Sequence, residues 1–446
     1  MTSTDRPALL GGTAAVDSSR HVKWPVLGDR DRAAINAVLD RGVLSGPFAP
    51  EVTALQQEWA DYVGARHCLA TNSGTAALHV ALAAAGIGPG DEVLVPAFTF
   101  VASALAVLHH NAIPVFVDVE TETWGLDPAL TEAAITPRTR AILPVHLHGT
   151  PCRIDELAAL AERRGLLLIE DACQAHGATR HGRKVGSIAP MGAFSLQSSK
   201  NLACGEGGLF VTSSDELLER ANRVRMFGEN VRPGDGAGYR IDRALDGDRA
   251  YDSVTMGWMY RMTELQAALA RSQLRRLDHW NENARRNAAV MSRTLGELPG
   301  VTPPRIPDGS TSIFHKYRLR FDATAVGVER PAREVRDLLV KALRAEGVDA
   351  VLWQTQPVPG QQLFRDQIGY GRRGDRGPGT PWDLGAPVDY RVEQFPVTLG
   401  LLDSSLCLFS HTYPIYPQPQ ELAAAYAEAF AKVWRALPEL IAETGR

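Results

Sequence analysis

The sequence has few cysteines and no long apolar run, and each shortage excludes a class of protein. Its five cysteines are odd in number, without a CxxC pair or the spacing of a zinc site, so we expect reduced thiols and no bound metal. The start of the chain lacks the basic and continuously apolar segment of a secretory signal, and no segment approaches the roughly 18 apolar residues of a membrane span. We therefore expect a cytoplasmic protein that does not enter a membrane.

A large excess of charge of one sign is also missing. The chain has 47 lysines and arginines against 51 aspartates and glutamates, a formal net charge of -4, and no run of like charge stands out. Such a chain has no long-range attraction for nucleic acid or for an anionic membrane, and it has no basic extension suited to DNA binding. Small molecules are the expected ligands.

Short apolar runs alternate with amphipathic segments between about residues 65 and 215. This alternation of strands and helices favours a mostly parallel central sheet with helices on both faces, an α/β fold. The strands are expected at residues 92–95, 113–117, 141–145, 166–169 and 209–212, with helices at 75–86 and 153–164.

The second half of the chain contains the expected domain boundary. A chain of 446 residues is too long for one core of ordinary size. Residues 230–256 are rich in Gly, Asp and Arg and are predicted to be an irregular excursion, a long helical stretch spans 263–297, and a proline-rich junction follows it. We predict an N-terminal arm (1–30), a large domain (31–300) and a smaller C-terminal α+β domain (301–446) with helices at 331–346 and 418–440.

The most informative segment surrounds Lys200. An apolar strand ending at Ser195 runs into a polar turn that contains Lys200, and a glycine-rich reversal at residues 205–208 follows. A lysine at the carboxyl end of a sheet strand stands where α/β sheets bind ligands. Taken alone, a loop lysine is more often a solvated surface residue, so the neighbouring motifs decide whether Lys200 belongs to a ligand site.

Asp171 ends another apolar strand, some thirty positions earlier. A carboxylate in this position suits an enzyme that uses pyridoxal phosphate (PLP), because it keeps the pyridinium nitrogen protonated and the ring able to accept electrons. The alternative is an aspartate that caps a following helix, and the sequence does not decide between the two.

Two further strand ends complete the pattern. Gly74 and Thr75 open an amphipathic helix after a small-residue turn, where free backbone N–H groups and the helix dipole favour a phosphate, although an ordinary N-cap has the same appearance. Phe100 follows another strand and can stack on a flat heteroaromatic ring; the alternative is an aromatic side chain in the core.

With these segments in order, the chain resembles the DegT/StrS-type sugar aminotransferases, a family of fold-type I PLP-dependent enzymes that make amino sugars and aminocyclitols. The resemblance runs from about residue 20 to 300 and more loosely to the end. Its marks are Asn72-Ser73-Gly74-Thr75, Pro96 to Phe100, Pro144-Val145-His146, Glu170 to Gly177, and Phe194-Ser195 before Lys200 with Gly205 to Gly208 after it.

The resemblance implies a role for each of these residues. Lys200 would carry PLP as a Schiff base, Asp171 would bind the pyridine nitrogen, and Gln174 would lie beside the phenolic oxygen of the ring. Phe100 would stack on that ring. The phosphate of the cofactor would be held by Ser195, Gly74 and Thr75.

One position departs from the family pattern. Residues 257–264 resemble the family's Gly-x-Asn-Tyr-Arg-Met-x-Glu, with Met259 where asparagine is usual. In the family this asparagine reaches the cofactor phosphate of the neighbouring subunit, and a thioether cannot donate that hydrogen bond. Family members are usually dimers with interfacial sites, so we expect a homodimer in which either a donor from residues 230–256 replaces the asparagine or PLP binds less tightly.

Transamination is the expected reaction. Sugar dehydratases of the same family have histidine in place of the lysine, whereas Lys200 can anchor PLP and then move a proton between the cofactor's C4′ and the substrate carbon. Glutamate or glutamine is the expected amino donor, and pyridoxamine phosphate would form in turnover. The acceptor would be a keto sugar, commonly nucleotide-linked, or a keto cyclitol, in amino-sugar or antibiotic biosynthesis.

Two other readings stay open, namely different PLP chemistry such as dehydration or condensation, and a non-catalytic ligand sensor. The presence of Lys200, Asp171, Gln174 and Ser195 together disfavours the sensor, which needs no proton shuttle. Substrate contacts are predicted less sharply, because every candidate can equally serve in packing. They are His146, His148, His315 and Lys316 within residues 314–317, Trp353 and Gln354.

Overall fold

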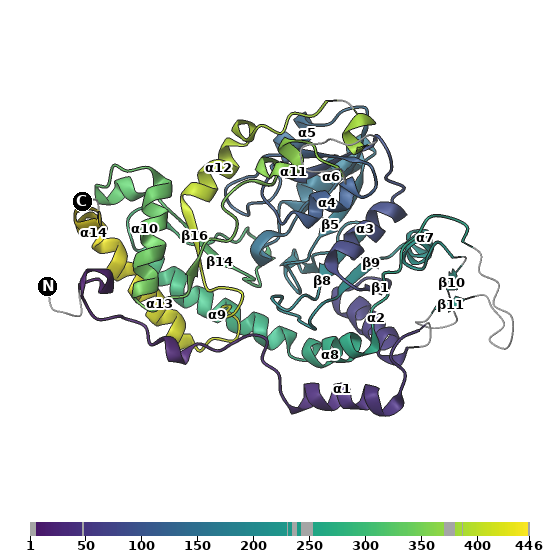
Figure 1. Cartoon of the computed structure of the whole chain (residues 1–446), viewed down its shortest axis with the longest axis horizontal. Helices are drawn as coiled ribbons and strands as arrows, with labels where there is room; N and C mark the ends of the chain where they lie inside the picture. Colours follow the sequence, from purple (N-terminus) through teal and green to yellow (C-terminus); the bar gives the residue numbers. More distant parts are fainter. Residues whose placement is uncertain are drawn as a thin grey trace.

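A seven-stranded sheet forms the centre of the larger part of the computed structural model (Figure 1). Its order is β1-β9-β8-β5-β4-β2-β3, and β9 alone runs antiparallel to its neighbours. The predicted mostly parallel α/β sheet is therefore confirmed. The strands are β1 (His67–Thr71), β2 (Glu92–Pro96), β3 (Ile113–Val117), β4 (Thr139–Ile142), β5 (Leu167–Asp171), β8 (Met191–Ser195) and β9 (Gly208–Thr212).

Residues that alternate along these strands face opposite helical layers, as the period of two requires. Val93 and Val95 pack with α3 (Gly74–Ala84), α4 (Ala102–Leu108) and α7 (Asp215–Arg225), whereas Leu94 faces α6 (Ile154–Arg164) on the other side. Phe194 and Leu209 face α2 (Pro50–Val63) and α8 (Glu264–Leu274) on that second side. The short α5 (Pro128–Ala133) packs against α6.

A four-stranded antiparallel sheet lies at the other end of the molecule, in the order β12-β14-β16-β15 (Figure 1). Helices α9, α10, α13 and α14 supply most of the apolar side chains that cover it. The elements are β12 (Val301–Thr302), β14 (Tyr317–Phe321), β15 (Ala350–Val351), β16 (Ser405–Leu408), α9 (Leu277–Gly296), α10 (Ala332–Ala345), α13 (Gln420–Arg435) and α14 (Leu437–Thr444).

The remaining elements are small. A three-stranded sheet has the order β13-β6-β7, and β10 pairs with β11. Their bounds are β6 (Thr179–Arg180), β7 (Arg183–Lys184), β10 (Val231–Pro233), β11 (Tyr239–Ile241), β13 (Ser310–Thr311), α11 (Gln362–Arg365) and α12 (Pro396–Asp403). The structure describes residues 6–46, 49–229, 231–233, 239–241, 253–369, 380–385 and 387–444, so most of the predicted excursion at 230–256 lies outside the described residues.

Residues from each side of the predicted boundary near 300 pack in the core that surrounds the other sheet. Met291 and Leu295, on α9, pack in the core of the small sheet. Phe364 and Leu401, which follow the boundary in sequence, pack in the core of the large sheet. The boundary therefore stays a prediction, and the long helical stretch predicted at 263–297 is two helices, α8 and α9. Among the described helices, none is both long and apolar enough to cross a membrane.

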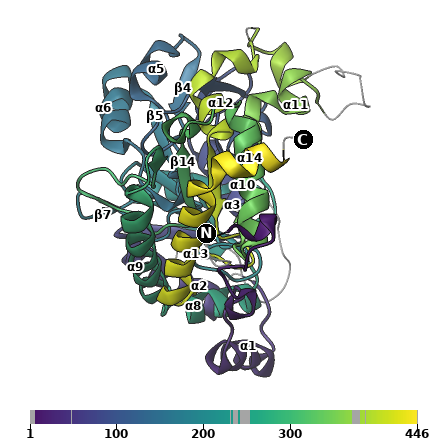
Figure 2. The same ribbon diagram turned by 90° about the vertical axis from the view of Figure 1, so that its left-hand side faces the viewer.

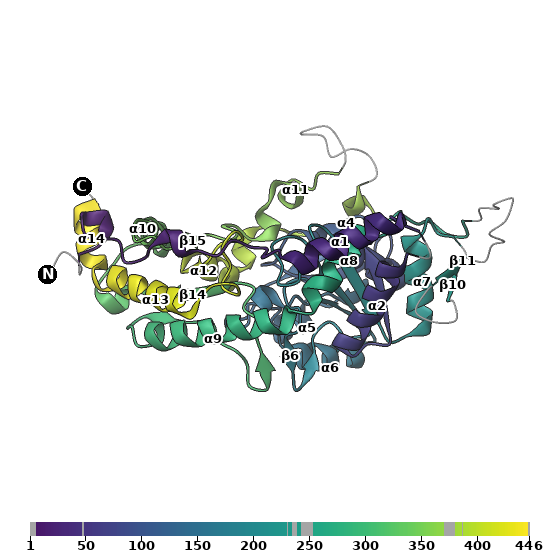
Figure 3. The same cartoon turned by 90° about the horizontal axis from the view of Figure 1, so that it is seen from below.

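The N-terminal segment lies along the helices that cover the four-stranded sheet before it reaches α1 (Asp29–Arg41), as Figures 2 and 3 show from two sides. The buried carboxylate of Glu346 accepts the backbone N–H groups of Ala8 and Ala15 at 2.8 and 2.9 Å, and Lys432 donates to the same carboxylate at 3.0 Å. The segment then crosses to the seven-stranded sheet's side of the molecule, where α1 packs against α8. The start of the chain is thereby fixed to Glu346 and Lys432, which are distant in sequence.

Candidate active site

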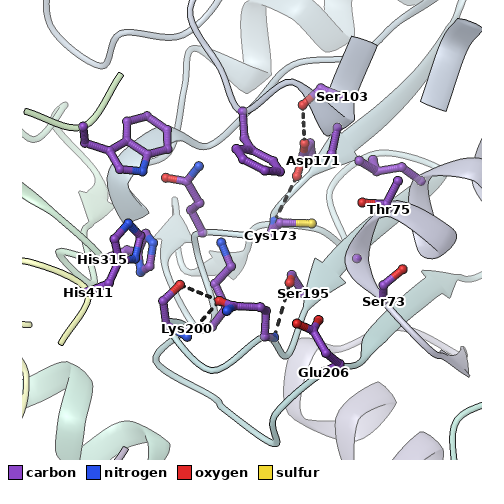
Figure 4. Close-up of a pocket in the computed structure, with 18 residues that line it drawn as sticks. Ser73, Thr75, Ser103, Asp171, Cys173, Ser195, Lys200, Glu206, His315 and His411 are labelled. Atoms are coloured by element: carbon purple, nitrogen blue, oxygen red, sulfur yellow. Dashed lines mark hydrogen bonds between the residues drawn. The ribbon is translucent and has the colours of Figure 1, made fainter. Parts of the chain in front are cut away.

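A cavity of about 530 Å³ lies where polar loops follow the carboxyl ends of β1, β5 and β8 (Figure 4). This is the edge at which a mostly parallel sheet gathers ligand-binding side chains. Every residue predicted to hold the cofactor lines it, namely Gly74, Thr75, Phe100, Asp171, Gln174, Ser195 and Lys200.

Lys200 lines the cavity and is only partly exposed, so it is not a fully solvated surface lysine. Burial lowers the pKa of its ammonium group, and the nearby Cys173, Asp171 and Glu206 oppose that shift without cancelling it. A lower pKa increases the fraction of neutral amine near pH 7. Lys200 is therefore better suited to attack a carbonyl than an ordinary lysine.

Asp171 ends β5 with its carboxylate held in place on both oxygens. Ser103 donates its hydroxyl to Oδ2 at 2.7 Å, and the backbone N–H of Cys173 donates to Oδ1 at 3.1 Å. Turns rather than a helix follow at residues 172–178, so the alternative of a helix cap is wrong. Each carboxylate oxygen can accept more than one hydrogen bond, which leaves Asp171 able to accept one from a protonated ring nitrogen.

The start of α3 forms a narrow cradle beside the end of β8. Ser73 caps the helix, because its Oγ accepts the N–H of Ala76 at 3.1 Å, while the N–H groups of Gly74 and Thr75 have no earlier helical turn to supply an acceptor. A Cβ on Gly74 would lie 2.6 Å from Cβ of Ser195. The capping and phosphate interpretations of this turn are thus compatible. The N–H groups of Gly74 and Thr75, with the hydroxyls of Thr75 and Ser195, fit a phosphate.

Phe100 and Gln174 line the same cavity. The side chain of Phe100 is 55% exposed, whereas Phe98, two positions earlier, is fully buried, so Phe100 is not a core aromatic. Gln174 is buried, and its Oε1 accepts the backbone N–H of His148 at 3.0 Å. The donors and acceptors therefore fit PLP, with a phosphate cradle, a face for the ring, a carboxylate and a lysine around one space.

Of the predicted substrate contacts, His315 and Trp353 line the cavity and are joined by His411. Burial, with the nearby positive charge of Lys200 and Lys316, lowers the pKa of His315 well below its usual value. Burial also lowers the pKa of His411 to about 4, with the same two lysines adding to the shift. Both imidazoles are neutral near pH 7 and can each donate and accept one hydrogen bond.

The other substrate candidates lie outside the residues that line the cavity. His146 is fully buried, with Nε2 2.9 Å from a carboxylate oxygen of Glu170 and Nδ1 accepting the N–H of Cys152 at 3.2 Å, so its ring is occupied in the core. Lys316 is buried beside β14. His148 packs against aromatic rings, and Gln354 donates to the carbonyl of Thr99.

Several residues of the cavity were not singled out from the sequence. Ser103 lies in the first turn of α4, three residues after Phe100, whereas His411 comes from a distant segment without any recognisable spacing. The polar lining residues to which the sequence analysis assigns no role are Ser73, Ser103, Cys173, Gln197, Ser199, Glu206 and His411.

Glu170, the neighbour of Asp171, points to the opposite side of β5 and has a structural task. Its fully buried carboxylate accepts the N–H groups of Gly186, Ile188 and Ala189 at 2.6 to 2.7 Å, as well as contacting His146. We expect Glu170→Gln to lower the free energy of unfolding by about 3 kcal/mol, because an amide replaces a charged acceptor of several hydrogen bonds.

Urea unfolding of the purified variant measures this loss. The matched control is Glu156→Gln, which removes an exposed carboxylate that pairs with exposed Arg153 and should change stability by about 0.5 kcal/mol or less. Equal effects of the two substitutions would contradict the structural role of Glu170.

Comparison with known proteins places this site in a family. The model of the DegT/DnrJ/EryC1/StrS aminotransferase family matches residues 25–374. L-glutamine:2-deoxy-scyllo-inosose aminotransferase of Streptomyces fradiae is 36% identical over 435 residues, which cover 96% of this chain and 98% of that protein. The dTDP-3-amino-3,4,6-trideoxy-alpha-D-glucose transaminase of Streptomyces venezuelae is 40% identical over 330 residues, 73% of this chain and 79% of that protein.

A solved structure agrees with the sequence relatives. The crystal structure of 3-amino-5-hydroxybenzoic acid synthase matches with a TM-score of 0.79 and 29% identity, covering 97% of this chain and all of that one. The fold, the cavity and the family match point to the same chemistry. The chain belongs to the DegT/DnrJ/EryC1/StrS aminotransferase family and is a PLP-dependent aminotransferase.

Proposed function

We propose that this chain transfers the amino group of L-glutamine or L-glutamate to a keto cyclitol or keto sugar, with Lys200 as the catalytic residue. The observation that carries the proposal is the convergence of Lys200, Asp171 and the phosphate cradle at Gly74 and Thr75 on one cavity. When bound, PLP supplies a protonated ring that withdraws electrons from the reacting carbon.

The residues around the cavity divide the remaining work. Lys200 would hold the cofactor through Nζ, and its free amine would take up and return the proton of the reacting carbon. Asp171 would keep the ring nitrogen protonated, and Ser103 orients Asp171. Ser195, with Gly74 and Thr75, would hold the phosphate and so position the cofactor relative to Lys200.

A keto cyclitol is the first candidate for the acceptor. Apart from Lys200, Asp171 and Glu206, the polar groups that line the described cavity are neutral hydroxyl, amide, imidazole, thiol and indole groups, which suit a polyhydroxylated ring. The Streptomyces fradiae relative, whose match covers 96% of this chain, is named as an L-glutamine:2-deoxy-scyllo-inosose aminotransferase. A nucleotide-linked keto sugar is the second candidate, favoured by the name of the Streptomyces venezuelae relative.

The expected homodimer belongs to this proposal. Large apolar side chains are exposed near the end of α7 and in the segment that precedes α8, and a second copy of the chain is a suitable cover. They are Phe227, Val254, Met256 and Met259. A cytoplasmic location and the effect of Met259 on binding of the cofactor phosphate stay predictions.

An absorption spectrum of the PLP-loaded protein tests the proposed function. Addition of L-glutamine should convert the band of lysine-bound PLP, near roughly 420 nm, to that of pyridoxamine phosphate, near roughly 330 nm, and a keto cyclitol should reverse the change. A protein that takes up no PLP would contradict the proposal, and a band that no amino donor changes would favour other PLP chemistry. Reversal only by a nucleotide-linked keto sugar would select the second acceptor.

A further inference from the structure

The main chain at Lys200 is held by side chains from two other parts of the molecule. Lys200 lies in the loop between β8 and β9, outside any helix or strand. The indole Nε1 of Trp24, in the N-terminal arm, donates to the carbonyl oxygen of Lys200 at 3.1 Å. The hydroxyl of Tyr416 donates to the carbonyl oxygen of Ser199 at 2.7 Å. Two consecutive carbonyls are thus fixed from outside the loop.

Both donors are rigidly placed. Trp24 is 4% exposed and Tyr416 is fully buried, and their rings meet edge to face with centroids 4.7 Å apart. Trp280 of α9 packs on Trp24 in the same manner at 5.7 Å. The backbone N–H of Trp24 donates to the carbonyl of Thr412 at 2.9 Å. Aromatic side chains packed in this way have little freedom to rotate, so they can fix the position of whatever they bind.

These contacts connect the lysine loop to the substrate side of the cavity. Thr412 and Tyr416 belong to the segment after β16 that also carries His411, and His411 lines the cavity. A displacement of this segment or of the arm would therefore move the backbone of Lys200 relative to the cradle at Gly74 and Thr75, which belongs to the large domain.

We infer that Trp24 and Tyr416 are positioning residues for proton transfer by Lys200. The side chain of lysine is long and flexible, so its Nζ is placed accurately only if its backbone is fixed. Nζ must reach both the cofactor carbonyl and the proton of the reacting carbon, and small displacements in such a geometry lower the rate strongly. The inference rests on the proposed role of Lys200.

The test compares Trp24→Phe and Tyr416→Phe, which each remove one donor and keep an aromatic ring. The matched controls remove the same kind of bond elsewhere. Trp434→Phe deletes a buried indole donor to the carbonyl of Pro299. Tyr390→Phe deletes a buried hydroxyl donor to the carbonyl of Pro114, together with the bond that this hydroxyl accepts from Trp382.

Two readouts separate positioning from general stability. Hydrogen exchange of PLP-free protein should be faster in the peptide of residues 196–204 for both loop variants and unchanged there for both controls. In single-turnover reactions with L-glutamine, each loop variant should lower the maximal rate about 10-fold, change the half-saturating concentration less than about 2-fold, and increase the isotope effect of α-deuterated L-glutamine.

Unchanged exchange and unchanged maximal rate in both loop variants would overturn the inference, and so would equal effects in the controls. If Trp24→Phe does not fold, Tyr416→Phe alone decides, since it removes a single oxygen atom. A wild-type protein that reacts with no amino donor would instead count against the proposed function, and the exchange experiment would still report whether the two bonds hold the loop.

Discussion

Lys200→Ala is expected to abolish transamination while leaving the fold intact. The cavity residues described here offer no second lysine, so the variant loses both the group that binds PLP covalently and the group that moves the proton. We expect the rate of the half-reaction with L-glutamine to fall by about 10⁴-fold or more. The phosphate cradle and Asp171 are untouched, so pyridoxamine phosphate should still bind, without a covalent link.

Stopped-flow absorbance and dialysis with pyridoxamine phosphate measure these two properties on the same protein. The control is Lys184→Ala, which removes another partly buried lysine whose Nζ donates to the carbonyl of Tyr62, outside the cavity; its activity should stay within about 2-fold of wild type. Substantial turnover by Lys200→Ala would remove Lys200 from its proposed role and with it the proton-transfer step proposed above.

Local patterns were sufficient to predict the part of the site that lies at strand ends. Asp171 and Lys200 each follow an apolar run that reads as a buried strand, and neighbouring strands of a mostly parallel sheet bring such ends together. Phe100 and Gly74 also come shortly after strands, β2 and β1, of the same sheet. The alternative for Asp171, a helix cap, could be removed only by the structure, because turns at residues 172–178 replace the helix.

The contributions of the arm and the small domain could not be predicted in this way. Trp24 and Tyr416 bind the lysine loop, and His411 lines the cavity, through tertiary packing alone, because no sequence period connects positions so far apart. His146 shows the opposite failure, since a histidine within a recognisable motif proved to be a buried partner of Glu170. Motifs identify residues that a fold needs as readily as residues that a reaction needs.

Asp171→Asn is expected to have the second-largest effect on activity. Compared with Glu170→Gln, it distinguishes a residue of β5 that the reaction needs from one that the fold needs. Asparagine can still accept the N–H of Cys173 with its Oδ1, and its amide N–H can donate to the hydroxyl of Ser103, which then donates to Thr99 instead. The local fold should therefore survive, with the free energy of unfolding changed by about 1 kcal/mol or less. The neutral amide of asparagine cannot keep a ring nitrogen protonated. We therefore expect the rate of the half-reaction to fall by about 10²-fold to 10³-fold.

The contrast with Glu170→Gln makes the experiment decisive, because the two carboxylates are adjacent in sequence and face opposite sides of β5. Glu170→Gln should lose stability and retain most of its activity per folded molecule, whereas Asp171→Asn should retain stability and lose activity. Single-turnover rates and urea unfolding on both variants give the four values. If Asp171→Asn keeps its rate within about 10-fold of wild type, the carboxylate does not control the protonation of the ring, and Asp171 serves the fold as Glu170 does.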